Sequence, residues 1–115
     1  MIYAKPGTPE SVISFKSRYE NFIGGEWVAP VKGEYFNNIT PVTGEVICEI
    51  PRSGEADIEL ALDAAHKARE AWGKTSVQDR SNILLKIADR IEANLEKLAV
   101  AETWDNGKAV RETLN

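Results

Sequence analysis

The distribution of proline is the feature that most constrains how this chain folds. All five prolines lie within the first 51 of its 115 residues, and so do five of its eight glycines. Proline removes a backbone donor and clashes with the preceding helical turn, so this half is not expected to hold long helices. From residue 54 onward the chain contains no proline. The sequence therefore predicts a division near residue 52, with strands before it and helices after it.

The first half divides into an arm and a strand region. Residues 1–18 show little periodicity and are predicted to form an extended N-terminal arm, either frayed or held on another subunit. Residues 19–51 are predicted to form β-hairpins and strands, because Gly24-Gly25 between apolar flanks favours a tight turn. Further turns are expected at 32–33 and 41–44, followed by a strand at 45–50 that places Cys48 on its apolar face.

Residues 52–115 have the periodicity of helices. A first helix is expected to end at Trp72, with Gly73 as the left-handed C′ residue beyond it. Ser76 with an acid three residues later is typical of the N-cap of a second helix. Asn94 is expected to break the run before a third helix that ends at Asn106-Gly107, and residues 108–115 begin another helical segment. Three helices carry an apolar pattern. One face of the first holds Ile58, Ala61, Leu62, Ala65, Ala68 and Trp72, and the stripe of the second holds Leu84, Ile87, Ala88, Ile91 and Leu95. The third helix is expected to carry Leu95, Leu98 and Ala99 inward.

The predicted fold class is α+β, with N-terminal β-hairpins followed by three to four amphipathic helices. These helices present more apolar surface than a few short strands can cover. The last helical segment also carries no stop signal. We therefore expect the chain to be the front part of a longer protein.

Composition excludes several classes of function. The chain carries 14 basic and 18 acidic residues, a net charge of −4, and has no basic tail, so no nucleic-acid partner is expected. No run of 18 apolar residues exists, so no membrane span is expected. Prolines near the N-terminus argue against a signal peptide, and the single cysteine fits a reducing compartment. These features predict a cytoplasmic protein.

A self-contained active site is not evident in the sequence. His66 is the only histidine and is expected to be a solvated surface residue. Cys48 has no adjacent base and is expected to be a buried small apolar residue. Glu102 lies seven residues after Leu95 and is expected to face inward with an arginine or backbone partner. Asp105 at a helix end is either part of a plain C-cap or an oxygen ligand for a cation.

Five blocks of sequence resemble the aldehyde dehydrogenase family in order and spacing. They are Phe22-Ile23-Gly24-Gly25-Glu26-Trp27-Val28, Thr40-Pro41-Val42-Thr43-Gly44-Glu45-Val46-Ile47, the segments 57–72 and 80–89, and Glu102-Thr103-Trp104-Asp105-Asn106-Gly107-Lys108. The segment 76–80 and the last block are similar to the bacterial acetaldehyde dehydrogenase branch.

The resemblance implies an NAD(P)-dependent enzyme that oxidises small aliphatic aldehydes to carboxylic acids. In the family a cysteine thiolate attacks the aldehyde, hydride passes to NAD(P)+, and a glutamate-activated water hydrolyses the thioester. The resemblance places those groups and the cofactor-binding units outside this sequence, so no residue here is expected to be catalytic or to bind NAD. Residues 52–115 would pack on the absent cofactor-binding domain, in a larger α/β fold and a homotetramer. A sodium or potassium ion would be held by oxygens at Ile39 and Asp105.

Two other interpretations remain open. The chain could be a stand-alone helical interaction module that binds subunits of the full-length enzyme through its apolar helix faces. It could also be an independent small enzyme, although no nucleophile–base pair supports that reading. Solubility and cooperative melting of the 115-residue chain would distinguish a module from a segment.

Overall fold

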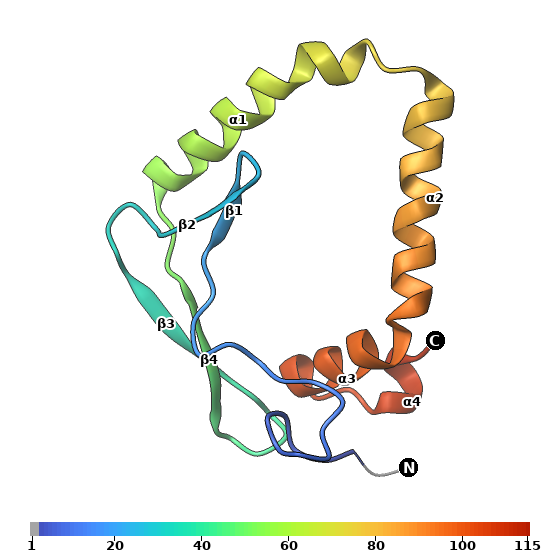
Figure 1. Ribbon diagram of the computed structural model, residues 1–115. Helices are drawn as coiled ribbons and strands as arrows, with labels where there is room; N and C mark the ends of the chain where they lie inside the picture. The colour runs from blue at the N-terminus through green and yellow to red at the C-terminus, as the bar shows by residue number, and fades with distance from the viewer. Residues whose placement is uncertain (1–2) are drawn as a thin grey trace.

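The computed structural model describes residues 3–115 (Figure 1). Four strands are followed by four helices, as the predicted fold class required. The strands are β1 (Asn21–Ile23), β2 (Glu26–Val28), β3 (Tyr35–Ile39) and β4 (Val46–Pro51). The helices are α1 (Glu55–Gly73), α2 (Val77–Ala93), α3 (Leu95–Asn106) and α4 (Val110–Thr113).

The β1–β2 hairpin confirms the predicted tight turn. Its strands are antiparallel, with Ile23 opposite Glu26, so Gly24 and Gly25 alone form the loop. Both glycines have positive φ angles, 63° and 84°, which residues with a side chain rarely adopt. The hairpin packs against the first part of α1.

The second hairpin pairs β3 with β4, again antiparallel, with a register shift between Asn38 and Ile39. The other edge of β4 is covered by the end of the arm. There the Tyr19 N–H donates to the Glu49 carbonyl at 2.9 Å, and the Glu49 N–H donates to the Ser17 carbonyl at 2.9 Å. The chain before β1 is therefore tied to β4 of its own chain. Cys48 is buried as predicted.

Local signals placed most helix ends correctly. Ser76 Oγ accepts the Asp79 N–H at 3.0 Å, so it is the N-cap of α2. Asn94 separates α2 from α3, and its side-chain amide donates to the Arg90 carbonyl at 2.8 Å. Gly107 ends α3 with a φ of 81°. The expected role of Gly73 as a left-handed cap is wrong. It is the last residue of α1, and Lys74 follows with helical angles while its N–H donates to the Glu70 and Ala71 carbonyls.

The core lies where the β3–β4 hairpin meets α3. The apolar residues buried there are Cys48, Ala99, Val100 and Trp104. By contrast, α1 and α2 run along two sides of an open arc, with α3 across its lower end (Figure 1). The radius of gyration is 17.5 Å. A compact domain of this length has a value of about 13 Å.

The apolar faces of α1 and α2 are largely exposed, as expected of helices with more apolar surface than the strands can cover, but the inward position predicted for Leu95 and Leu98 is wrong. Ala99 is 2% exposed, but Leu84 is 67% exposed, Trp72 49% and Leu98 47%. The reason is that, among residues 3–115, α1 packs mainly on β1 and α2 mainly against α3, so much of each apolar stripe is left uncovered. None of the helices in that range is long and apolar enough to cross a membrane.

Candidate functional site

The junction of β3, the following turn and the end of α3 gathers the most informative side chains. Thr40 is fully buried, and its hydroxyl donates to the Trp104 carbonyl. That carbonyl lies in the last turn of α3, where backbone acceptors lack a helical donor. Thr40 Oγ1 also accepts the Val42 N–H at 3.2 Å. One hydroxyl therefore joins the strand region to the helical region and orders the turn at 41–44.

Gly107 completes this junction on the helix side. A Cβ atom at this position would lie 3.0 Å from Cγ of Pro41, closer than ordinary contacts allow. Its φ of 81° independently disfavours a side chain. Glycine is thus required both to end α3 and to let the turn after Thr40 approach.

A polar chain crosses the same junction beside the buried cysteine. The Asn38 amide donates to Asp105 Oδ1 at 2.9 Å and lies 4.0 Å from Cys48 Sγ. Burial raises the pKa of the Cys48 thiol, and the negative charge of Asp105 raises it further, although the Asn38 amide acts in the opposite direction. Cys48 is therefore a neutral thiol without an activating base, and not a nucleophile.

The predicted cation ligands lie near each other but do not form a closed site. Asp105 is hydrogen-bonded to Asn38, the residue before Ile39, so the end of α3 does meet β3. Ile39 is 56% exposed. Between residues 3 and 115 there is no group of three His, Cys, Asp or Glu side chains that could hold a metal ion. The cation site at Ile39 and Asp105 stays a prediction.

Two other predicted residues have clear positions. His66 is exposed on α1, as expected. Glu102 does not face inward as predicted. It is exposed, its carboxylate lies 3.9 Å from the Lys108 ammonium, and it accepts the Asn106 amide at 3.3 Å. The apolar face that it shares with Leu95 is an exposed face of α3, so no buried arginine partner is needed.

Asp57 is a structural residue that sequence reasoning did not single out. It is buried at the start of α1, where its carboxylate accepts the Gly54 N–H at 2.9 Å and the Val31 N–H at 2.8 Å. These two hydrogen bonds hold its pKa below the ordinary value. An acid three residues after a glycine that precedes a helix was the available signal, because the N3 side chain can reach back to the cap.

A second polar cluster fixes the arm to the sheet. The Arg18 guanidinium lies 3.9 Å from the centre of the Tyr35 ring and donates to Glu49 at 2.8 Å. The Tyr35 hydroxyl donates to Glu20 at 2.6 Å, and this hydrogen bond raises the pKa of the phenol. The pKa of Arg18 is raised by its hydrogen bond to Glu49. These contacts join the end of the arm to β3 and β4, so the role of the cluster is to position the arm.

The family can be read from the comparison with known proteins. A family model described as the aldehyde dehydrogenase family matches residues 27–115. The chain belongs to the aldehyde dehydrogenase family. An acetaldehyde dehydrogenase from Pseudomonas aeruginosa is 72% identical over 115 residues, which are the whole of this chain and 23% of that protein. A long-chain-aldehyde dehydrogenase from Acinetobacter is 68% identical over 114 residues, 99% of this chain and 23% of that protein.

The fold agrees with solved structures of the family. The crystal structure of an NAD-dependent aldehyde dehydrogenase from Sinorhizobium meliloti matches with a TM-score of 0.81 and 31% identity. The match covers 98% of this chain and 23% of that one. The chain thus spans less than a quarter of the length of these aldehyde dehydrogenases, and the predicted resemblance to the family is confirmed.

The residues present do not fit a complete NAD site. The sequence holds no glycine-rich phosphate loop of the usual pattern. One groove is lined mainly by apolar side chains from the arm, α2 and α3. No nucleophile and base lie together at any of the clusters described above. This segment of an aldehyde dehydrogenase forms a junction between strands and helices, and two long helices extend from it.

Proposed function

We propose that this chain is the N-terminal scaffolding portion of an NAD(P)-dependent aldehyde dehydrogenase that oxidises small aliphatic aldehydes such as acetaldehyde to carboxylic acids. The observation that carries the proposal is the exposed apolar surface of α1 and α2 in a chain that spans 23% of its relatives. A soluble protein rarely leaves so many large apolar side chains in water, so the remainder of the enzyme is expected to cover them.

Within that enzyme the chain's own residues act by positioning. Thr40 and Asp57 tie the strands to the helices at two points, and the Arg18 cluster holds the arm on β4. These ties give α1 and α2 fixed directions from which they can support a cofactor-binding domain. The thiolate, the general base and the cofactor site are supplied by other parts of the polypeptide.

Sequence similarity alone favours small aldehydes over long ones as the substrates of this enzyme. The relative named for acetaldehyde is 72% identical, and the one named for long-chain aldehydes is 68% identical. The test is to assay the full-length enzyme with NAD+, NADP+ and aldehydes of two to twelve carbons. We expect the highest kcat/KM with NAD+ and acetaldehyde. A preference for the longest aldehydes would contradict the substrate assignment, and no oxidation of any aldehyde would contradict the function.

The 115-residue chain by itself is expected neither to bind NAD+ nor to reduce it with acetaldehyde. Isothermal titration with NAD+ and absorbance of NADH test this directly. Turnover by the purified chain, free of host enzyme, would contradict the proposal. If the chain alone is inactive but monodisperse and cooperatively folded, the alternative of a stand-alone interaction module gains support.

The cation and assembly assignments belong to the same proposal. The Asn38–Asp105 hydrogen bond supports a meeting of β3 with α3 at which the Ile39 carbonyl and Asp105 hold Na+ or K+. We expect NaCl or KCl, but not tetramethylammonium chloride, to raise the melting temperature of the full-length enzyme, and Asp105→Asn to abolish this difference.

Sedimentation of the full-length enzyme is expected to show a homotetramer. Cell fractionation is expected to place the enzyme in the cytoplasm, without bound nucleic acid or membrane.

A further inference from the structure

Asn106 and Gly107, at the end of α3, form a pair with a chemical reactivity of its own. Asn106 is the only asparagine of the chain that is followed by glycine. A backbone nitrogen can attack the side-chain amide of the asparagine before it, and a glycine without Cβ hinders that attack least. Asn106 is also exposed to water, which the reaction consumes. The pair is therefore a candidate for deamidation, a covalent change that needs no enzyme.

The fold prepares the side chain of Asn106 for this attack. Its Oδ1 accepts the Lys108 N–H at 2.9 Å, and its amide donates to the Glu102 carboxylate at 3.3 Å. The first hydrogen bond closes a ring that contains the Gly107 nitrogen, so the side chain is turned toward the backbone that would attack it. A donor on Oδ1 also withdraws electrons from Cγ and stabilises the negative oxygen that forms during attack.

The same fold holds back the attacking nitrogen. The Gly107 N–H donates to the Thr103 carbonyl at 2.8 Å, so its proton is engaged in a hydrogen bond of the last turn of α3. Attack requires this nitrogen to lose its proton and to rotate toward Asn106 Cγ. Pro41 restricts that rotation, since a Cβ at Gly107 would lie 3.0 Å from Pro41 Cγ. The reaction is therefore expected to follow the opening of the last turn of α3.

We propose that Asn106–Gly107 is a modification site that deamidates when the end of α3 opens away from the turn after Thr40. The Gly107 nitrogen gives up its proton and bonds to Asn106 Cγ, the Cγ–Nδ2 bond breaks, and ammonia leaves with that proton. Water then opens the succinimide at either carbonyl and yields aspartate or isoaspartate at position 106. The proposal is independent of the proposed function, because it involves only this chain and water.

The products are expected to weaken the end of α3. A carboxylate at position 106 lies in the last turn of the helix, where the helix dipole disfavours negative charge. It also lies beside Glu102, four residues earlier, and like charges at that spacing repel. Isoaspartate in addition inserts a methylene into the backbone directly before Gly107, where Pro41 is already close. Because the change is irreversible, this part of the fold loosens as molecules age.

Incubation of the full-length enzyme in H₂¹⁸O at mildly alkaline pH tests the proposal. Only asparagines that react during incubation gain ¹⁸O, which mass spectrometry detects after digestion in ordinary water. Fragmentation of the peptide separates aspartate from isoaspartate. We expect ¹⁸O in both products at position 106, and faster than at Asn82 and Asn94, which precede the bulky Ile83 and Leu95. Unfolding in urea is expected to raise the rate at Asn106 by about tenfold or more.

Two variants test whether opening of the helix end controls the reaction. Thr40→Val removes the donor to the Trp104 carbonyl and is expected to raise the native rate at Asn106 about tenfold. Thr43→Val, at an exposed position of the same turn, is the matched control and is expected to leave the rate unchanged. In urea both variants are expected to react at the rate of the wild type, because the difference between them lies in opening.

The opposite results overturn the proposal. Absence of ¹⁸O at position 106 in the native enzyme, with incorporation in urea, would show that the fold excludes the reaction. Equal rates in the native and the unfolded enzyme, or in Thr40→Val and wild type, would show that the end of α3 does not control it. A rate at Asn82 or Asn94 equal to that at Asn106 would remove the special role of Gly107.

A separate variant measures the effect of the product. Asn106→Asp, which is one of the two products, is expected to speed hydrogen exchange in the last turn of α3 of the full-length enzyme about fivefold. Asn82→Asp adds the same charge at an exposed position within α2 and is expected to leave exchange in α3 unchanged. Equal exchange of α3 in these two variants would contradict the loosening of the helix end.

Discussion

At the scale of residues, the contact between Thr40 and Trp104 joins the two halves of the chain. Replacing Thr40 with Val keeps the shape of the side chain but leaves the buried Trp104 carbonyl without a donor. We expect the local opening free energy of α3 to fall by about 1–3 kcal/mol. Hydrogen exchange of the full-length enzyme measures it. Thr43→Val is the control, because Thr43 is exposed in the same turn, and an equal loss there would contradict this role.

Asp57 gives a residue-scale prediction for pH. Its folded pKa is depressed by hydrogen bonds from Gly54 and Val31, so its contribution to stability is present above the unfolded pKa of about 3.9. That contribution is lost as the pH falls through the folded pKa, which is lower still. We expect Asp57→Asn to lower the urea midpoint of the full-length enzyme at pH 7, and the difference from wild type to narrow only below about pH 4.

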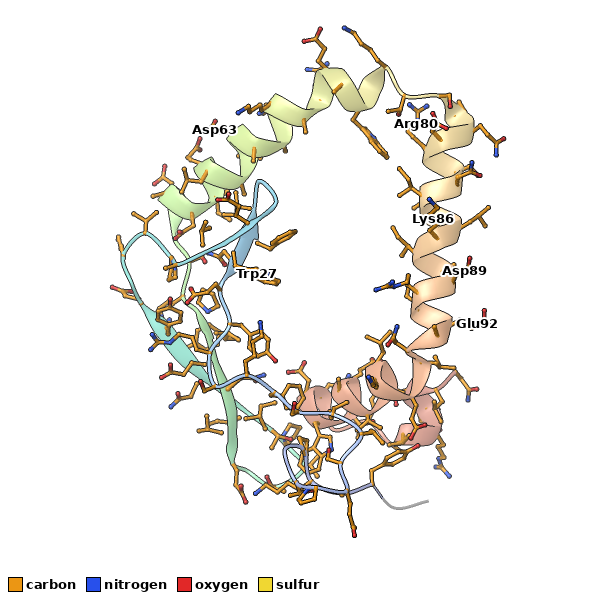
Figure 2. The ribbon with its side chains drawn as sticks, viewed as in Figure 1. Trp27, Asp63, Arg80, Lys86, Asp89 and Glu92 are labelled. Atoms are coloured by element: carbon orange, nitrogen blue, oxygen red, sulfur yellow. The ribbon has the colours of Figure 1, made fainter. Side chains whose placement is uncertain are left out.

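The control for Asp57 lies on the same helix. Asp63 is exposed on the outer side of α1 (Figure 2), so Asp63→Asn is expected to leave the urea midpoint unchanged at every pH. A difference between Asp57→Asn and wild type that is the same at pH 7 and pH 3.5 would contradict the role of its charge.

Single residues also show where sequence reasoning failed. Glu102 and Leu98 were predicted to be inside because they follow the apolar spacing of α3. Instead the small Ala99 and Val100 are buried, with Trp104, against the strands. Because α3 is apolar on more than one face, spacing alone does not reveal which face the rest of this chain covers. The burial of Asp57 was not predicted, because its second hydrogen bond comes from Val31, 26 residues earlier.

At the scale of elements, local signals were sufficient where local chemistry decides the structure. The Gly24-Gly25 turn, the Ser76 N-cap and the end of α3 at Gly107 were all predicted from a few neighbouring residues. Gly73 was the exception. A left-handed cap requires the chain to leave the helix there, whereas Lys74 continues in helical angles. The pairing of the arm with β4 is non-local, so no pattern in the arm predicted it.

The N-cap of α2 provides a test at this scale. Ser76→Ala removes the acceptor for the Asp79 N–H and is expected to cost about 1 kcal/mol. Faster hydrogen exchange in the first turn of α2, in the full-length enzyme, would show this loss. Ser81→Ala within the same helix is the matched control and is expected to be neutral or slightly stabilising, since alanine favours helices. Similar acceleration in both variants would contradict the capping role.

At the scale of the whole molecule, the helices form an open arc (Figure 1). Their positions were predicted correctly, but α1 and α2 do not pack together into a compact core. The predicted apolar stripes of α1 and α2 are present, but most of their side chains are exposed and have no packing partner within residues 3–115. We expect the isolated 115-residue chain to bind a hydrophobic dye and to melt without a cooperative transition. Circular dichroism and dye fluorescence measure both properties. A sharp two-state melt without dye binding would show that the chain is an independent domain.

We expect these residues to work as one segment of a longer aldehyde dehydrogenase. The most direct test is the intact mass of the native polypeptide that contains this sequence, isolated from its source and measured by mass spectrometry. The chain has a mass of 12.7 kDa and covers 23% of its Pseudomonas relative, so we expect a native mass of about 55 kDa. A native mass of 12.7 kDa would contradict it and would identify a short product that needs a binding partner.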